Sequence, residues 1–182
     1  MHRKPVPLLG KRVVELGCGP GLGAVAAALL GAAEVVATDG DAELLSLATE
    51  NLDLNVTAVG LRKRCSCAQL LWGDKAAASA LKPPFDVVLA ADCAAVVYEG
   101  AFSDLVESLV ALSSESSLVL LSYHRRHKTE DSFFLALSEK FDISKCPTSD
   151  IHPDFSSSEI TVFQLRKLPE IPHLSRQVTP LI

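Results

Sequence analysis

The sequence has few aromatic residues and no long apolar run. Aromatic residues make up 5% of its 182 residues, with one Trp and two Tyr. No strongly apolar run reaches the roughly 18 residues that a membrane-spanning helix needs, so we expect no membrane partner. The basic N-terminus, residues 1–5, is not followed by an apolar stretch, which excludes a secretory signal. Hydrophobic residues nevertheless make up 48% of the chain, which excludes a disordered protein.

The chain also lacks C-x-x-C pairs and net positive charge. Its cysteines are five in number, and Cys65 and Cys67 have no histidine near them, so we expect core thiols and no metal site. Free thiols are typical of a reduced compartment, and we expect the cytoplasm, with the nucleus as a second location. The net charge of −5 argues against nucleic-acid binding.

Strand-like apolar runs alternate with helical segments along the chain. The expected strands cover residues 11–16, 34–39, 64–70, 85–91, 117–123, 141–146 and 160–165. The expected helices cover residues 22–30, 42–54, 75–81, 102–112 and 129–140. This alternation predicts an α/β fold: a Rossmann-like, seven-stranded, mostly parallel sheet with helices on both faces. We expect one domain over residues 1–168 and a loose tail over residues 169–182.

The spacing of apolar residues predicts which helix faces are buried. In segment 42–54 the expected buried stripe consists of Leu44, Leu45, Leu47, Leu52 and Leu54. In segment 129–140 it consists of Phe133, Phe134 and Leu137.

A glycine-rich turn follows the first expected strand. Residues 13–23 read VVELGCGPGLG, and an Ala/Leu-rich segment follows at once. This order predicts a strand, a tight loop and a helix whose N-terminal N–H groups face a ligand. Leu22 stands where the dinucleotide fingerprint G-x-G-x-x-G needs its third glycine, which disfavours a dehydrogenase. A glycine-rich turn that binds no ligand is the alternative for the loop taken alone.

An acidic residue ends the second expected strand. Asp39 lies twenty-two residues after Gly17, where a carboxylate can accept hydrogen bonds from both hydroxyls of a ribose. A strand-end Asp is often only a helix N-cap, but Asp41, directly before Ala42, is placed to fill that role. We therefore favour Asp39 as the ribose ligand.

Four expected strands bring candidate residues to one edge of the sheet. Ligands of parallel α/β sheets bind beyond the carboxyl ends of the strands. The loop 17–21, Asp39, Trp72 and Asp92 all follow such ends. Their convergence is stronger evidence for a binding site than any one of these motifs.

Four successive motifs resemble those of the methyltransferase-like protein-lysine methyltransferases, which are seven-strand enzymes that use S-adenosylmethionine. The motifs are ELGCGPG at 15–21, VATD at 36–39, LWGD at 71–74 and PFDVVLAADC at 84–93. The similarity extends from about Leu9 to Leu168 and is greatest to the group that contains the valosin-containing-protein lysine methyltransferase.

The resemblance implies roles for the motif residues. Those expected to bind S-adenosylmethionine are Glu15, Gly17, Cys18, Gly19, Gly21, Asp39, Trp72 and Ala91. Asp39 would bind the ribose and Trp72 the adenine, although core packing is the alternative for this single Trp. Asp92 and Tyr98 would hold the lysine amine for catalysis.

The sequence departs from the family pattern in two places. The family has D-x-x-Y after the fourth strand, whereas here Tyr98 follows Asp92 by six positions. The family also carries a segment before the glycine loop, and we expect this leader to be missing here. These departures favour, as an alternative, a vestigial domain that acts through protein contacts.

The expected partner is a protein substrate, bound by a monomer. A chaperone-type ATPase follows from the resemblance. The basic run 124–128 follows the fifth expected strand, and it is either a solvated face or a contact for an acidic substrate surface. A small molecule or RNA is the alternative methyl acceptor, although no strip of mixed aromatic and basic residues favours RNA.

Overall fold

The computed structural model describes residues 8–94, 100–127, 130–155 and 159–169. Within these ranges the strands are β1 (Arg12–Leu16), β2 (Glu34–Asp39), β3 (Cys65–Gln69), β4 (Val87–Ala91), β5 (Leu118–His124), β6 (Phe141–Lys145) and β7 (Ile160–Lys167). The α-helices are α1 (Leu22–Leu29), α2 (Ala42–Val56), α3 (Lys75–Ala80), α4 (Phe102–Leu112) and α5 (Asp131–Ser138). None of the helices in these ranges has the length and apolar character that a bilayer crossing requires.

The strands form one seven-stranded sheet in the order β3-β2-β1-β4-β5-β7-β6. The first five strands of this order run parallel, whereas β7 pairs antiparallel with both β5 and β6. The predicted α/β fold with a mostly parallel sheet is confirmed. The strand β2 and the helix α4 begin and end at the expected residues.

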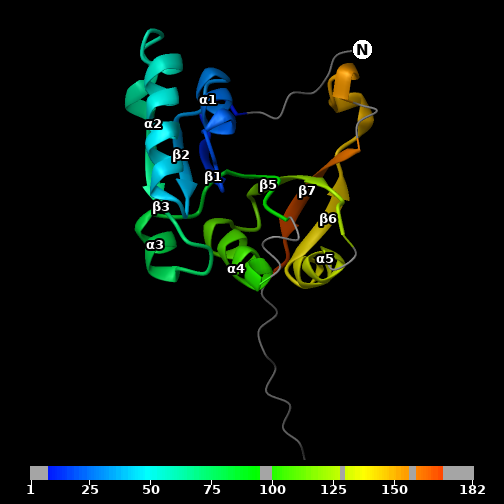
Figure 1. Ribbon diagram of the computed structural model, residues 1–182. Coiled ribbons are helices and arrows are strands. Elements are labelled where there is room, and N and C mark those ends of the chain that lie inside the picture. The colour runs from blue at the N-terminus through cyan, green and yellow to red at the C-terminus, as the bar shows by residue number, and fades with distance from the viewer. Residues whose placement is uncertain (1–7, 95–99, 128–129, 156–158, 170–182) are drawn as a thin grey trace, which may run out of the picture.

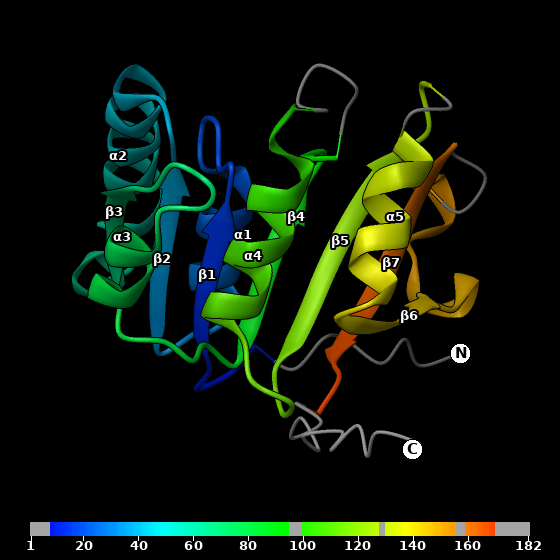
Figure 2. The same ribbon diagram turned by 90° about the horizontal axis from the view of Figure 1, so that it is seen from below.

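Helices cover both faces of the sheet (Figure 1). One face carries α1 and α2, and the other carries α3, α4 and α5, which lie in front of the strands in Figure 2. The inner strand β1 is therefore buried on both sides, which explains why its sequence, RVVEL, is largely apolar. This arrangement leaves the carboxyl ends of the parallel strands at a shared edge.

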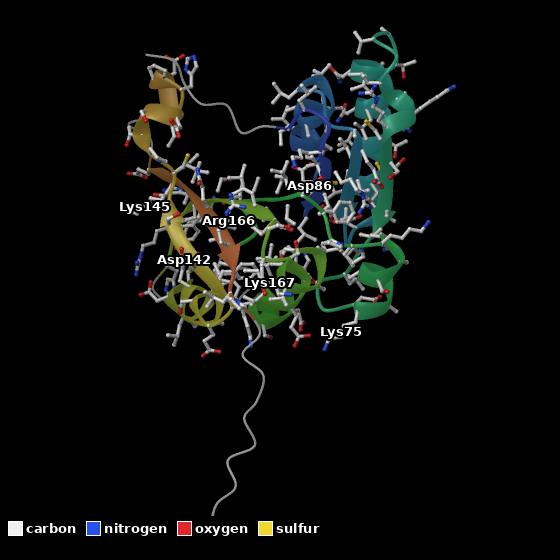
Figure 3. The ribbon with its side chains drawn as sticks, turned by 180° about the vertical axis from the view of Figure 1, so that it is seen from behind. Lys75, Asp86, Asp142, Lys145, Arg166 and Lys167 are labelled. Atoms are coloured by element: carbon white, nitrogen blue, oxygen red, sulfur yellow. The ribbon has the colours of Figure 1, made fainter. Side chains whose placement is uncertain are left out.

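Charged side chains protect one edge strand of the sheet. Asp142 and Lys145 on the edge strand β6 are exposed, as is Arg166 on the neighbouring β7 (Figure 3). Charges on an edge strand oppose its pairing with a second sheet.

The buried stripe of α2 differs from the expected one. Its buried residues are Ala48, Leu52 and Val56, whereas Leu44, Leu47 and Leu54 are exposed. The reason is the close approach of α2 to the glycine loop, because a Cβ added at Gly21 would lie 3.1 Å from the Ala48 Cβ. A leucine at this contact would not fit, so the helix turns an alanine inward. In α5 the expectation holds for Phe133 and Leu137, which are buried.

Glu15 is a buried carboxylate beneath the start of α1. It is 4% exposed, and its Oε2 accepts a hydrogen bond from the Ala24 N–H at 2.8 Å. A Cβ added at Gly23 would lie 2.2 Å from its Oε1, so this position needs a glycine. Burial raises the pKa of Glu15 to about 7, although the N–H groups of Ala24 and Gly23 favour its charged form. The helix start thus rests directly on this side chain.

The raised pKa of Glu15 predicts a pH dependence of stability that Glu15→Gln removes. The native state favours the protonated carboxyl, so this stabilisation is complete below the ordinary pKa of 4.5 and is lost as pH rises through about 7. We expect the free energy of unfolding of the wild type to fall by about 2 kcal/mol between pH 5 and 8. Urea unfolding at several pH values measures it. Glu50→Gln, at an exposed site on α2, should keep the wild-type slope, and an equal slope in Glu15→Gln would contradict the assignment.

Two leucines of α5 provide a matched test of the core. Leu137 is fully buried, whereas Leu135 is 68% exposed on the same short helix. We expect Leu137→Ala to lower the free energy of unfolding by about 2–5 kcal/mol, and Leu135→Ala to change it by about 0.5 kcal/mol or less. Chemical denaturation of both variants checks this, and similar losses at the two sites would mean that α5 packs differently.

Candidate active site

The strand register brings the expected site residues to the carboxyl edge. Leu16, the last residue of β1, pairs with Thr38 on β2 and with Ala90 on β4. The glycine loop after β1, Asp39 and Ala91 are therefore neighbours at this edge. We refer to it below as the carboxyl edge.

The glycine loop is packed on one side and open on the other. A Cβ added at Gly17 would lie 2.9 Å from the Cys93 Sγ and 3.5 Å from a ring carbon of Trp72. A Cβ at Gly19 would meet no atom of the described residues within 4 Å, although Gly19 has a φ of +50° that favours glycine. Among the described residues, the space above Gly19 is thus open to a ligand that approaches the backbone, and the methionine part of S-adenosylmethionine stays its predicted occupant.

Asp39 faces the same space as Gly19. Its Oδ2 accepts a hydrogen bond from the Gly19 N–H at 2.9 Å, and its Oδ1 accepts one from the Asp41 N–H at 3.0 Å. Each carboxylate oxygen keeps a further acceptor site, which suits the two hydroxyls of a ribose. The capping role expected of Asp41 is confirmed, because its side chain accepts from the Glu43 N–H at 2.7 Å.

The position of Trp72 is compatible with both of the roles expected for it, core packing and a contact with adenine. It follows β3, is half-buried, and packs against the hydrophobic core under α3 and α4. Its ring also lies beside the Gly17 end of the loop. The next residue is fixed as well, because the Gly73 N–H donates to the Ser108 Oγ at 2.9 Å. The indole therefore stands at the border of the core and the carboxyl edge, and its contact with adenine stays a prediction.

Two thiols lie beneath the loop and are chemically inert. Burial raises the pKa of Cys18 to about 12, and burial likewise raises the pKa of Cys93 to about 12. The Cys93 thiol also donates to the Leu16 carbonyl at 3.2 Å. Neither forms a thiolate near neutral pH, so both act as packing groups. The described part of the chain contains no group of three His, Cys, Asp or Glu side chains that would hold a metal ion.

Asp92 follows β4 and forms an ion pair that the sequence did not predict. Its Oδ1 and Oδ2 accept from Nη1 and Nη2 of Arg126 at 2.7 and 2.8 Å. Its φ of +60° is in the left-handed region, which Asp tolerates better than most residues. Ala91, just before it, is exposed, whereas Tyr98 lies outside the described residues. The sequence signal for this ion pair was an arginine shortly after β5, the strand that pairs with β4.

A buried carboxylate supports the loop that carries Arg126. Glu130 is fully buried and accepts from the Tyr123 hydroxyl at 2.6 Å and from the Arg126 N–H at 3.0 Å. Burial, together with the bond to Glu130, raises the pKa of Tyr123 above its ordinary value, so the hydroxyl stays protonated. A cavity of about 150 Å³ lies beside the ion pair. It is lined by Asp92, Ser122, Tyr123, His124, Arg126 and Ile160.

Three residues of the basic run 124–128 have partners in the described part of the molecule. Arg125 pairs with Asp131 at 2.8 Å, and His124 lies 2.9 Å from a carboxylate oxygen of Glu159. Arg126 is held by Asp92, so three residues of the run each have a carboxylate partner. This arrangement favours a solvated, internally paired face over a contact for an acidic surface.

Known proteins share both the sequence and the fold. A family model described as "Lysine methyltransferase" matches residues 3–140. The chain is 36% identical over 165 residues to the protein N-lysine methyltransferase METTL21A of Danio rerio, covering 89% of this chain and 69% of that protein. It is 35% identical to METTL21A of Mus musculus, covering 81% of this chain and 66% of that protein. The chain thus spans about two thirds of the length of these relatives.

Solved structures show the same fold at low sequence identity. A putative rRNA methylase from Clostridium thermocellum superposes with a TM-score of 0.63 at 14% identity, covering 89% of both chains. A magnesium protoporphyrin IX methyltransferase from Synechocystis with bound S-adenosylmethionine gives a TM-score of 0.62 at 16% identity, covering 88% of this chain and 72% of that one. The sheet is therefore that of the S-adenosylmethionine-dependent methyltransferases, and the chain belongs to the lysine methyltransferase family.

Proposed function

We propose that this protein transfers a methyl group from S-adenosylmethionine to the side-chain amine of a lysine in a protein substrate. The observation that carries the proposal is the open space above Gly19, which Asp39 also faces, at the same edge as the Asp92 carboxylate. Membership of the lysine methyltransferase family supports the choice of acceptor.

The residues of this chain supply binding and alignment. When bound, S-adenosylmethionine supplies a methyl group already activated by its sulfonium, so the protein needs to orient the reactants and exclude water. The Gly19 backbone and the Asp39 carboxylate hold the donor, and Trp72 borders it. Asp92 holds the lysine amine in line with the methyl group. The amine first loses its proton to solvent, and its lone pair then forms the bond to the methyl carbon as the bond between that carbon and sulfur breaks.

The finer identity of the partner is also a proposal. A relative from Arabidopsis thaliana, 37% identical over 91 residues, is named a calmodulin-lysine N-methyltransferase. The resemblance of the motifs supports instead a chaperone-type ATPase as the substrate of this chain. We propose that it acts as a monomer in the cytoplasm, with the nucleus as a second location. The internal pairing of the basic run gives no support to an acidic substrate surface.

A domain that acts only through protein contacts is the second candidate. Its support is the ion pair with Arg126, which occupies both oxygens of the Asp92 carboxylate in this structure. Binding and transfer must therefore be tested separately.

Binding of the donor depends on Asp39 but not on Asp41. We expect Asp39→Ala to weaken the binding of S-adenosylmethionine by about tenfold or more, because hydrogen bonds to a charged acceptor contribute about 1.5–3 kcal/mol. Asp41→Ala removes a carboxylate two residues away whose role is capping, so it should lower stability and leave affinity within about threefold. Calorimetric titration measures both. Equal losses would show that the effect is structural.

Methyl transfer should require Asp92. We expect tritiated methyl groups to enter protein in a cell lysate, to be recovered as methyl-lysine after acid hydrolysis, and to fall by about 100-fold or more with Asp92→Asn. Purified valosin-containing protein and purified calmodulin are the two candidate substrates to test in the same assay. Label recovered in RNA or in a small molecule would show that the methyl acceptor is not a protein. Normal donor binding without any transfer by the wild type would favour the protein-contact domain.

A further inference from the structure

The ion pair of Asp92 and Arg126 is a two-bond fork at the carboxyl edge. Its bonds are 2.7 and 2.8 Å long, and its residues come from adjacent strands, β4 and β5. Such paired bonds fix the plane of a carboxylate as well as its position. The orientation of Asp92 is therefore set by Arg126.

Arg126 is itself held from beneath. The fully buried Glu130 accepts its backbone N–H at 3.0 Å, and the same carboxylate takes the Tyr123 hydroxyl at 2.6 Å. Nη1 of Arg126 also donates to the His124 carbonyl at 3.3 Å. The guanidinium is thus part of a connected network that begins in the core under α5 and ends at Asp92.

A carboxylate without this cation would oppose the reaction. A lysine amine has an ordinary pKa of about 10.4, and a nearby negative charge raises that pKa further. A protonated amine has no lone pair with which to attack a methyl group. A permanent positive charge close by acts in the opposite direction and favours the neutral amine. Hydrogen bonds from Arg126 to Asp92 raise the pKa of Arg126 further, so it stays charged.

We infer that Arg126 is a positioning residue of the lysine site, which orients Asp92 and offsets its negative charge so that the substrate amine binds in its neutral form. The inference rests on the proposed function, because it takes Asp92 as the group that faces the lysine. The cavity of about 150 Å³ beside the pair is the space for the end of the lysine side chain.

Among the described residues, the other titratable groups around this cavity have hydrogen-bond partners. From β5, His124 lies beside Glu159 and Tyr123 beside Glu130, which precedes α5. On the donor side, Asp39 bonds to the loop and Glu15 to the start of α1. The backbone N–H of His127 also donates to the Glu130 carboxylate at 3.3 Å. Of these groups, Glu15 has its pKa raised to about 7 by burial, and its titration is common to the wild type and the Arg126 variants.

The binding of n-butylamine, the chemical equivalent of the lysine side chain, tests the inference directly. With S-adenosylhomocysteine saturating the donor site, we expect the apparent Kd for n-butylamine to fall between pH 7 and 9 in the wild type. The fall in Kd can reach about 100-fold at most. The site binds only the neutral amine, and the neutral fraction rises about tenfold with each of the two pH units. Arg126→Gln leaves the Asp92 carboxylate unpaired and should bind the charged amine, so its Kd should change little over this range. NMR titration measures both.

Matched variants separate charge from orientation. Arg126→Lys keeps the cation but loses the fork, so it should keep the pH dependence of n-butylamine binding while methyl-lysine formation falls by about tenfold. Arg125→Gln removes the neighbouring arginine, which pairs with Asp131, and should behave as the wild type.

The inference and the proposed function fail in different ways. If Arg126→Gln keeps the wild-type pH dependence of n-butylamine binding, or if the wild type shows no binding or no such dependence, the role of Arg126 is overturned. Methyl-lysine formation by the wild type would still uphold the proposed function in those cases. Loss of all methyl transfer by the wild type would overturn both. Thermal unfolding of each variant shows whether the fold is retained.

Discussion

The buried Glu15 is the contact on which the carboxyl edge depends. Its carboxylate accepts the Ala24 N–H at the start of α1, while its backbone carbonyl accepts the Thr38 hydroxyl at 2.7 Å. One residue therefore ties the end of β1 to both the following helix and the neighbouring strand. Asp39, next to Thr38, is held against Gly19 as a result. The relative position of the loop and the Asp39 carboxylate is thus set from beneath, before any ligand binds.

The glycines of the loop are needed for different physical reasons. Gly17 is limited by the Cys93 thiol, Gly21 by Ala48 and Gly23 by Glu15, at 2.9, 3.1 and 2.2 Å from an added Cβ. Gly19 has no such neighbour among the described residues. The motif therefore contains three glycines whose Cβ would collide with a neighbouring side chain and one, Gly19, that has space above it. Side chains at those three positions would disturb the fold before they disturbed binding.

The sequence predicted the fold well because buried parallel strands appear as short apolar runs, and it grouped the site residues because such strands end at one edge. It failed where a choice depended on distance between elements. Of the α2 leucines expected in the core, Leu52 is buried, but Leu44, Leu47 and Leu54 are exposed because the close approach of Gly21 selects Ala48. Likewise, a run of basic residues does not reveal which of them meets Asp92, since that depends on the register of β4 with β5. The insertion of β7 between β5 and β6 had no local signal.

The two halves of the carboxyl edge differ in charge. The half over β1 and β2 presents the Asp39 carboxylate, which suits the hydroxyls of a ribose and the positive charge of a sulfonium. The half over β4 and β5 presents a carboxylate already paired with Arg126, so its net local charge is near zero. Methyl transfer from a cationic donor needs an acceptor that is not itself cationic. A negative donor half beside a neutralised acceptor half meets this requirement, and the buried Glu130 maintains it by holding the backbone of Arg126.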